Sequence, residues 1–308
     1  MKPPAFVDCP GILSERLSPD MYSDIPGLEI FHGAPADEEG LIDRLRGRRH
    51  AMVSSGHLSR RVLDHCPELE TVAHLCSRLE DHADLAAAAR RNLRIECVGE
   101  TGDRSVAEHM VTLALCALKH IGETDRALRR GDTALPRGEE IRGKVFGVLG
   151  DGRGSDETAR LADALGATVM RWPERPGAMP EGTRWAALDE ILATADILSV
   201  HPSQGNGTDS ETITRFFDGI KPGVILVIAG RARAMDQAAL IEALQSGRVA
   251  HLACEFGPEL VADPASPLLT MGNVTCVSPS SWLTPSAVDR LLTSGFRLLA
   301  RHIAIYGN

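Results

Sequence analysis

Three closely spaced glycines at the end of an apolar run constrain the fold of this chain more than any other feature. Residues 145–149 read Val-Phe-Gly-Val-Leu, and Gly150, Gly152 and Gly154 follow before Ser155. A continuous apolar run of this length is typical of a buried parallel strand. Glycines let the backbone turn tightly and approach an anion without a Cβ in the way, and the next helix offers N–H groups at its start. The pattern is that of a dinucleotide-binding turn, G-x-G-x-x-G, except that Ser155 replaces the last glycine.

The residues after the turn provide the context that this pattern requires. Apolar residues recur at helical spacing through residues 156–165, acidic residues occupy the first turn, and Gly166 ends the pattern. A second apolar strand is expected at residues 167–172. Strand, glycine turn, helix and strand therefore occupy about thirty residues, which predicts a βαβ unit that binds a dinucleotide.

The end of the second strand indicates which dinucleotide to expect. Many NAD-binding folds carry an acidic residue there that hydrogen-bonds the ribose. This chain has Pro173 and then Glu174, while Arg171 and Arg175 could attract the 2′-phosphate of NADP. We therefore expect NAD, with NADP as the alternative. A βαβ unit that binds no nucleotide is a third interpretation, and Asp151 favours it because a carboxylate in the turn repels phosphate.

Composition excludes several classes of protein. The 308 residues, 43% of them hydrophobic and 24% charged, are typical of a soluble globular chain long enough for two domains. A formal net charge of −9 argues against nucleic acid or an anionic membrane as the main partner. No apolar run approaches the ~18 residues of a membrane span, and the first residues do not resemble a signal peptide. We expect a cytoplasmic protein that acts on a small molecule.

The cysteines and histidines predict neither a disulfide nor a metal site. The seven cysteines are scattered, odd in number and without a C-x-x-C pair, so we expect reduced thiols in the core. The eleven histidines show no ligand spacing such as H-E-x-x-H.

Alternating strands and helices indicate two doubly wound α/β units. In the first, strands are expected at residues 27–31, 50–54, 71–76 and 93–98, and helices at 37–46, 59–65 and 84–91. A long apolar helix is expected at residues 105–120. Later helices are expected at residues 188–193, 213–217, 237–245 and 285–304, and strands at 197–200, 224–229, 252–256 and 274–278. The expected fold is α/β, with a Rossmann-type dinucleotide-binding domain at residues 99–283 inserted into a flavodoxin-like substrate domain at 1–98 plus 284–308.

Several short segments, taken in order, resemble the D-isomer-specific 2-hydroxyacid dehydrogenase family, which includes phosphoglycerate and formate dehydrogenases. They are residues 92–99, Val-Ala-Glu-His at 106–109, Gly-Lys at 143–144, residues 195–202, Lys-Pro-Gly at 221–223, residues 240–247 and Asn-Val at 273–274. The resemblance spans most of the chain, from residue 45 to residue 300. It implies an NAD(P)-dependent oxidoreductase that moves a hydride between nicotinamide C4 and C2 of a 2-hydroxy or 2-oxo acid. It also implies a homodimer that uses the helix at residues 105–120.

By this resemblance, the cofactor would contact the glycine turn and the ends of neighbouring strands. The expected residues are Gly150, Gly152, Arg153, Gly154, Ser155, Glu174, His201 and Pro202. The family's substrate loop, which works through bare backbone amides, corresponds to Ser77, Arg78 and Leu79, and the usual arginine of the preceding strand end corresponds to Ser54. Side chains at Ser77 and Leu79 would crowd such a loop, whereas Arg78 either binds an anion directly or is a solvated surface residue.

Catalysis in the family implies an arginine that holds the substrate, a histidine that exchanges the proton, and a carboxylate that orients this histidine. Arg231, five residues before Asp236, matches the arginine, and the alternative is a surface arginine at a strand end. Glu259 matches the carboxylate, with a solvated loop glutamate as the alternative. The histidine position falls on Pro279 or Ser280, and neither residue exchanges a proton near neutral pH without an activating base.

Three functional hypotheses therefore remain. The first is an oxidoreductase of this family with an altered catalytic site, in which His201 is the best substitute for the missing histidine. The second is a catalytically silent relative that binds a dinucleotide or a small acid as a sensor or partner protein. The third is an enzyme that performs non-redox chemistry on the same scaffold, with Ser280 as a proton-transfer or binding residue.

Overall fold

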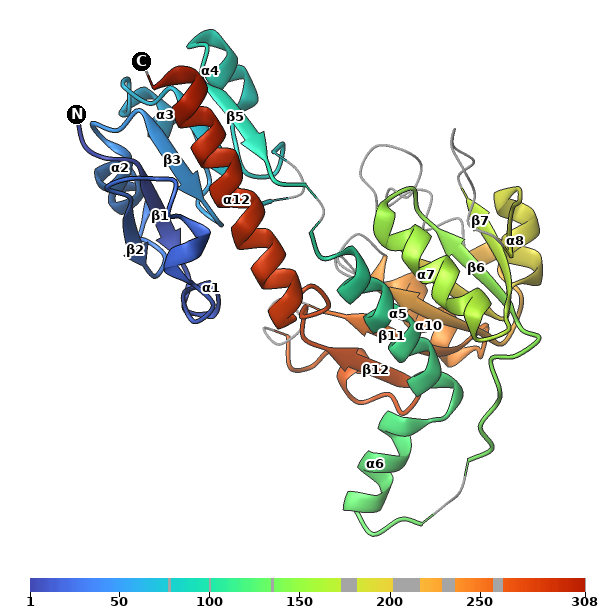
Figure 1. Cartoon of the computed structure of the whole chain (residues 1–308). Coiled ribbons are helices and arrows are strands. Elements are labelled where there is room, and N and C mark those ends of the chain that lie inside the picture. The colour runs from blue at the N-terminus through green and yellow to red at the C-terminus, as the bar shows by residue number, and fades with distance from the viewer. Residues whose placement is uncertain are drawn as a thin grey trace. The chain divides into compact units, whose positions relative to one another are not determined.

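The chain divides into two compact units in the computed structural model, which describes residues 1–76, 79–99, 101–133, 136–172, 182–201, 217–228, 236–256 and 263–307. The first unit comprises Met1–Gly102 and Leu283–Asn308, and the second comprises Asp103–Trp282. The sequence analysis placed the corresponding boundaries at residues 98 and 284. Each unit is built on its own parallel sheet, as Figure 1 shows.

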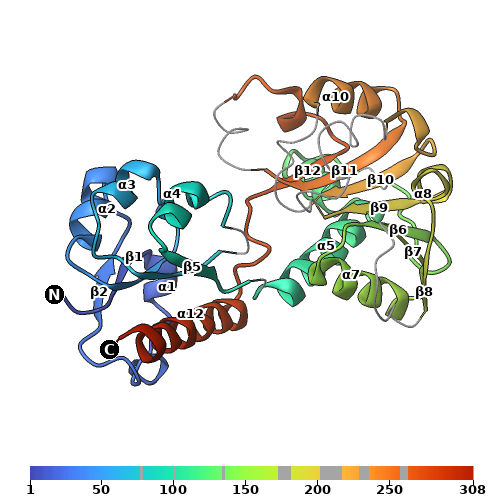
Figure 2. The same ribbon diagram turned by 90° about the horizontal axis from the view of Figure 1, so that it is seen from above.

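The first unit has a five-stranded sheet in the order β2-β1-β3-β4-β5, and every pairing is parallel. Its strands are β1 (Ala5–Cys9), β2 (Glu29–His32), β3 (His50–Val53), β4 (Thr71–His74) and β5 (Arg94–Cys97). Helices α2 (Glu38–Leu45), α3 (Arg60–Asp64) and α4 (Leu85–Arg90) cover one face, and α1 (Gly11–Ser14) and α12 (Pro285–Tyr306) cover the other (Figure 2). The order 2-1-3-4-5 is that of flavodoxin-like folds.

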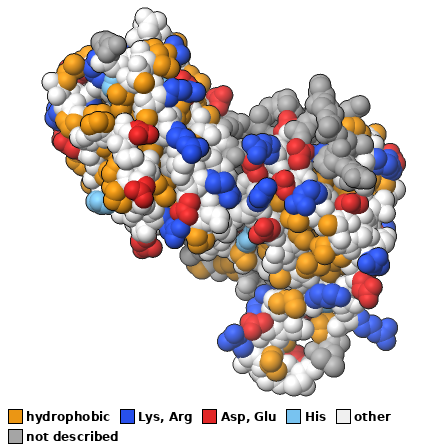
Figure 3. Space-filling model, viewed as in Figure 1, with side chains coloured by type: hydrophobic (Ala, Val, Ile, Leu, Met, Phe, Trp, Pro, Cys, Tyr) orange, Lys and Arg blue, Asp and Glu red, His pale blue; other side chains and the backbone are white. Residues whose placement is uncertain are grey.

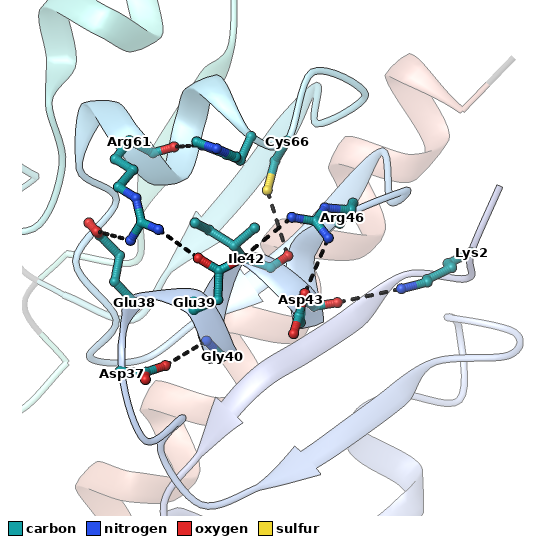
Figure 4. A network of polar contacts seen from close by, with 11 residues as sticks. Lys2, Asp37, Glu38, Glu39, Gly40, Ile42, Asp43, Arg46, Arg61 and Cys66 are labelled. Carbon is teal, nitrogen blue, oxygen red and sulfur yellow. Dashed lines mark hydrogen bonds and ion pairs between the residues drawn. The ribbon is translucent and has the colours of Figure 1, made fainter.

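Polar contacts hold α2 and α3 in place on the face of the first sheet that they cover. The side chain of Asp37 accepts the Gly40 N–H at 2.8 Å and so caps the start of α2. Arg61 on α3 pairs with Glu38 at 3.0 Å and with Glu39 at 2.6 Å on α2 (Figure 4). These charged groups are exposed, so each pair adds little to the free energy of unfolding. Apolar burial beneath α2, α3 and α4 is the larger contribution.

The second unit has a seven-stranded parallel sheet in the order β12-β11-β10-β9-β6-β7-β8. Its strands are β6 (Val145–Leu149), β7 (Thr168–Trp172), β8 (Thr183–Trp185), β9 (Ile197–Val200), β10 (Val224–Ile228), β11 (Val249–Glu255) and β12 (Val274–Val277). Numbered within the unit, this is the Rossmann order 3-2-1-4-5-6 with one further strand.

Helices cover both faces of this second sheet. Helices α5 (Asp103–Leu118) and α7 (Arg153–Ala164) pack on one face, and α8 (Leu188–Thr194) and α10 (Gln237–Gln245) pack on the other (Figure 2). Helix α6 (Ile121–Arg129) follows α5 and buries none of its residues. Short 3-10 turns lie at Pro19–Met21 in the first unit and at Pro267–Leu269 in the second.

The structure confirms the α/β fold class with two doubly wound parallel sheets, but the sequence analysis missed several elements. It did not predict β1, whose five residues lie between Pro4 and Pro10 and include a charged Asp8, although all five are buried. It also did not predict α1, α6 or β8. The helix expected at residues 213–217 lies outside the described residues apart from Phe217.

Surface charge, helix length and the grouping of metal-binding side chains bear on the expected partners and ligands. Acidic and basic side chains are interspersed over the face shown in Figure 3. Within the described ranges, every helix falls short of the length and apolar character that a membrane span requires. The described part of the chain also contains no group of three metal-binding side chains close enough to hold an ion.

Candidate functional site

The glycine turn lies at the carboxyl end of β6, directly against the end of β9. Gly150 has a φ of +148°, which L side chains rarely adopt. A Cβ atom on Gly150 would lie 2.7 Å from the carbonyl oxygen of His201 and 2.8 Å from its Cβ. The Gly150 N–H donates to the Trp172 carbonyl at 2.8 Å, so the turn is also attached to the end of β7. Glycine at this position therefore lets three strand ends converge.

Ser155 stabilises the turn from the first turn of α7. Its side chain is buried, and its hydroxyl lies 2.6 Å from the Gly152 carbonyl oxygen and 3.0 Å from the Gly150 carbonyl oxygen. The serine therefore fits where the fingerprint has its last glycine, and it adds hydrogen bonds to the turn. The departure that the sequence analysis noted does not disrupt the geometry.

The start of α7 is suited to an anion. Gly152 caps this 12-residue helix without a side-chain hydrogen bond to the first turn, which leaves that position to a ligand. The Arg153 side chain is 78% exposed and pairs with Asp103 of α5 at 3.2 Å. Backbone amides at a helix start together with an exposed guanidinium are the donors that a pyrophosphate requires.

Arg171, considered above as a partner for a 2′-phosphate, belongs to the interior. Its side chain is 1% exposed and pairs with Asp156 of α7. The guanidinium carbon also lies 4.8 Å from the centroid of the Trp185 ring. This arginine of β7 therefore contacts both α7 and the edge strand β8. Glu174, Arg175 and Pro202 lie outside the described residues.

His201 follows β9 and is held by its neighbours. Its Nε2 atom lies 2.9 Å from the Ser199 hydroxyl. Burial, with a smaller contribution from the Arg171 charge, lowers the pKa of His201 to about 4. The imidazole is thus neutral near pH 7, which makes it a poor proton donor and argues against the catalytic role that the sequence analysis considered for it.

A buried carboxylate, Glu255, ends β11 beside Ser280, one of the two positions that the motif resemblance assigned to the family histidine. Its Oε1 atom accepts the N–H groups of Ser280 at 2.8 Å and Ser281 at 2.7 Å. Its Oε2 atom accepts the Ser281 hydroxyl at 2.9 Å. Only 2% of the Glu255 side chain is exposed. The carboxylate therefore anchors the residues that follow β12 to the end of β11.

His109 of α5 completes this cluster. Its Nε2 atom lies 3.6 Å from Oε1 of Glu255 and is buried without a hydrogen-bond partner in the described ranges. One helical turn earlier, the Ser105 hydroxyl donates to the Ser281 carbonyl. The sequence analysis missed both His109 and Glu255 as functional residues. The available signal was Glu255 itself, the one acidic residue of β11.

The remaining expected site residues fall in separate places. The Ser280 hydroxyl lies 3.2 Å from the Ser278 carbonyl oxygen, so its hydrogen bond is to backbone and not to a base. Leu79 belongs to the first unit, where its carbonyl accepts the N–H groups of His82 and Ala83 at 2.9 Å each. Four further predictions lie outside the described residues: Ser77, Arg78, Arg231 and Glu259.

In the first unit, the Asp8 side chain of β1 contacts the loop that follows β3. Its carboxylate accepts the N–H groups of Ser54 at 2.6 Å, Ser55 at 2.8 Å and Gly56 at 2.7 Å. Burial raises the pKa of Asp8 despite these hydrogen bonds, which act in the opposite direction. The amides of this loop are therefore already satisfied by the protein's own carboxylate.

Comparison with known proteins agrees with this architecture. A parallel sheet in Rossmann order with a glycine turn after its first strand defines a dinucleotide-binding domain. Residues 111–279 match the sequence model of the D-isomer specific 2-hydroxyacid dehydrogenase NAD-binding domain. The chain belongs to this family, as its motifs indicated, and its second unit carries the NAD-binding domain that the cofactor prediction required.

Relatives and solved structures extend this result. The chain is 32% identical over 199 residues to D-3-phosphoglycerate dehydrogenase of Archaeoglobus fulgidus, covering 63% of this chain and 38% of the relative. It is 28% identical over 266 residues to the putative D-3-phosphoglycerate dehydrogenase of Schizosaccharomyces pombe, covering 84% and 57%. The chain thus spans 38 to 57% of the length of these two curated relatives.

Solved structures share the fold along nearly the whole chain. The structure of D-2-hydroxyisocaproate dehydrogenase aligns with a TM-score of 0.84 at 18% identity, covering 100% of this chain and 98% of that one. The NAD complex of formate dehydrogenase from Staphylococcus aureus aligns with a TM-score of 0.76 at 23% identity, covering 92% and 87%. At these identities the likeness shows the fold alone.

Proposed function

We propose that the chain is an NAD(P)-dependent oxidoreductase that acts on a 2-hydroxy or 2-oxo acid, or a related compound, with an altered catalytic site. The observation that carries this proposal is the glycine turn. Gly150 closes against His201, Ser155 stabilises the turn, and the start of α7 has no side-chain cap. These are the features that bring backbone amides to a pyrophosphate.

The residues fit a bound dinucleotide as follows. The amides at the start of α7 and the Arg153 guanidinium would hold the pyrophosphate. A bound nicotinamide supplies or takes up the hydride. The ion pair between Arg171 and Asp156 supports NAD over NADP, because this arginine is not available to a 2′-phosphate. Glu174, His201 and Pro202 stay predictions for the remaining contacts.

Substrate binding and catalysis are proposed from the resemblance. Arg231 would hold the substrate carboxylate, with Glu259 and Ser280 nearby in the second domain. Ser77, Arg78 and Leu79 would form the substrate loop of the first domain. The family motif has its histidine where this chain has Pro279 or Ser280, which is why we propose altered chemistry and not the standard proton exchange.

Cofactor binding and turnover test this proposal separately. Calorimetric titration with NAD⁺, NADH and NADPH should show binding of NAD⁺ or NADH, and tighter binding than NADPH. Turnover is then followed by nicotinamide absorbance with a panel of 2-oxo and 2-hydroxy acids. Replacing Arg231 by alanine should abolish any rate found. Absence of dinucleotide binding at millimolar concentration would refute the proposal.

A catalytically silent relative is the second candidate function. The observation in its favour is that the Ser280 hydroxyl lies against a backbone carbonyl, and no base contacts it in the described ranges. Dinucleotide binding without any change in nicotinamide absorbance across the substrate panel would favour this candidate. The same observation offers no support for a non-redox enzyme that relies on Ser280.

We also propose a homodimer. Helix α5, expected to form the contact, packs its apolar side chains against its own sheet. Helix α6 carries two of the exposed apolar residues, Ile121 at 53% and Leu128 at 66%. Seven residues apart on a helix, they share one face. The cytoplasmic location stays a prediction.

A further inference from the structure

His109 ends the Val-Ala-Glu-His motif, but neither the motifs nor the family resemblance predicted that it pairs with the carboxylate of Glu255. We propose that His109 exchanges the substrate proton in place of the missing family histidine, and that Glu255 positions its ring. This inference rests on the proposed oxidoreductase function. Three observations support the proposal. They are the geometry of the pair, its place at the carboxyl ends of the parallel strands, and the burial or remote location of the other histidines in the second unit.

The hydrogen bonds around Glu255 suit a carboxylate that orients an imidazole. Its contacts at Ser280 N, Ser281 N and Ser281 Oγ are all donors, so they satisfy the ionised form. They also fix the carboxylate, which has no freedom to turn towards solvent. The buried Nε2 atom of His109 faces Oε1 at 3.6 Å, a distance that a small closure converts into a hydrogen bond. A carboxylate placed so favours a proton on Nε2.

The pair lies on the side of the sheet where dinucleotides bind. Glu255 is the last residue of β11, and the glycine turn follows β6 at the same edge. The first turns of α5 lie close to that turn: Asp103 pairs with Arg153, and a Cβ on Gly154 would lie 3.8 Å from Val106. Helix α5 therefore reaches from the dinucleotide turn to the segment after β12.

The other histidines of the second unit are less suited to this role. Burial lowers the pKa values of His201 and His251 to about 4, so both are neutral at pH 7. His120 lies beyond the far end of α5, where it pairs with Glu123 at 3.0 Å. The His109 side chain is 23% exposed, while its Nε2 atom is buried.

Few other charges surround the pair in the described ranges. Asp103 and Arg153 pair with each other, and Arg104 and Glu108 on α5 are exposed. The segment after β12 contributes no titratable side chain between residues 278 and 282. Glu255 is therefore the buried charge that faces His109.

The proton moves as follows in the reductive direction. When C2 of a 2-oxo acid receives a hydride from the reduced nicotinamide, the carbonyl oxygen gains negative charge and takes a proton from the His109 imidazolium. The product is the 2-hydroxy acid, and the neutral imidazole regains a proton from solvent. In the reverse direction the neutral imidazole accepts the hydroxyl proton as the hydride leaves C2.

The first test needs no turnover. Nitrogen-15 NMR of the histidine side chains reports which ring nitrogen carries the proton. In the wild-type protein, His109 should be the Nε2–H tautomer when neutral, and in Glu255→Gln it should become a mixture. Glu123→Gln is the matched control, because it removes the carboxylate of the surface pair with His120 and should leave the His109 signal unchanged. A tautomer mixture at His109 in the wild-type protein would overturn the role given to Glu255.

The second test uses the active holoenzyme. His109→Gln should lower kcat by about 10²- to 10⁴-fold, as expected for loss of an acid/base, and should change the NADH dissociation constant less than about twofold. For reduction of a 2-oxo acid, the alkaline limb of the pH profile of kcat/KM should disappear in His109→Gln and shift in Glu255→Asp. Glu123→Gln should retain the wild-type rate and profile.

The outcomes separate the two proposals. A wild-type protein that reduces a 2-oxo acid while His109→Gln retains its rate and pH profile overturns the role of His109 and leaves the oxidoreductase function standing. A wild-type protein that turns over no substrate refutes the oxidoreductase function, and the role of His109 falls with it.

Discussion

The carbonyl oxygen of His201 lies only 2.7 Å from the place where a side chain on Gly150 would begin. Gly150→Ala must therefore separate the ends of β6 and β9, and it also strains a residue with a φ of +148°. We expect the free energy of unfolding to fall by roughly 1–3 kcal/mol and NADH binding to weaken at least about tenfold. Thermal unfolding and calorimetry measure the two effects.

Gly272→Ala is the matched control for this prediction. It lies in the same unit, and an added Cβ would meet nothing within 4 Å. This variant should unfold and bind like the wild-type protein. Equal NADH affinity in Gly150→Ala and wild type would show that the turn does not position the cofactor.

Ser155 offers a complementary test, because its hydroxyl contacts the turn without occupying the ligand's place. Ser155→Ala removes the hydrogen bonds to Gly150 and Gly152 and should cost about 0.5–1.5 kcal/mol of unfolding free energy. The affinity of Ser155→Ala for NADH should also fall. Ser246→Ala, which removes a hydroxyl from the end of α10, should leave cofactor affinity unchanged. A Ser155→Ala protein as stable as the wild type would contradict the stabilising role.

Local signals made most of the fold predictable from the sequence. The apolar run before Gly150 and the helical spacing after it predicted β6 and α7, and the same alternation predicted most other elements. Strand β1 was not predicted because the charged Asp8 interrupts an apolar run within a strand of only five residues. Its charge is accommodated by three N–H groups of the loop after β3, a partner that no local pattern contains.

The candidate site was less predictable for a related reason. Motifs locate residues by their order along the chain, so they found the glycine turn and assigned the family's histidine position to Pro279 or Ser280. His109 and Glu255 come from α5 and β11, and only the packing of that helix on the sheet brings them together. Likewise, Arg171 looked like an available cation until its burial against Asp156 and Trp185 was known.

Gly295 tests how closely α12 approaches the first sheet. A Cβ at this position would lie 2.3 Å from Leu75 Cδ2 and 2.8 Å from the Met52 sulfur. Gly295→Ala should therefore destabilise the protein by roughly 1–3 kcal/mol through overpacking, although alanine is the better helix former. Urea denaturation gives the difference. Arg297→Ala, an exposed substitution in the same helix, should change stability little. A stabilised Gly295→Ala protein would contradict this packing.

The exposed face of α6 predicts how the dimer forms. Replacing both Ile121 and Leu128 by glutamate places charges on that face and should convert a dimer into a monomer, because burying unpaired charge is costly. Light scattering should then give the single-chain mass of 33.1 kDa. The control is Ile305→Glu, an equivalent change at a 59% exposed residue of the first unit, which should leave the mass unchanged. A double variant that stays dimeric would show that the dimer interface does not lie on α6.

Asp196 gives a pH-dependent prediction for the second sheet. Burial alone raises the pKa of its carboxyl, but the Lys221 ammonium at 2.6 Å and the Val145 N–H at 2.8 Å outweigh burial and leave the pKa below its ordinary value. Since the unfolded pKa is about 3.9, this stabilisation is complete above that pH and is lost as the pH falls through the lower folded value.

Asp196→Asn should therefore lower the free energy of unfolding near pH 7 by on the order of 1 kcal/mol, and the difference should vanish in acid. Urea denaturation at a series of pH values measures it. Asp218→Asn, at an exposed position of the same unit, should show no such dependence. Because Val145 begins β6, the strand that leads into Gly150, the loss should also weaken NADH binding near pH 7. A stability difference that persists unchanged below the unfolded pKa would show that packing, and not charge, accounts for the contribution of Asp196.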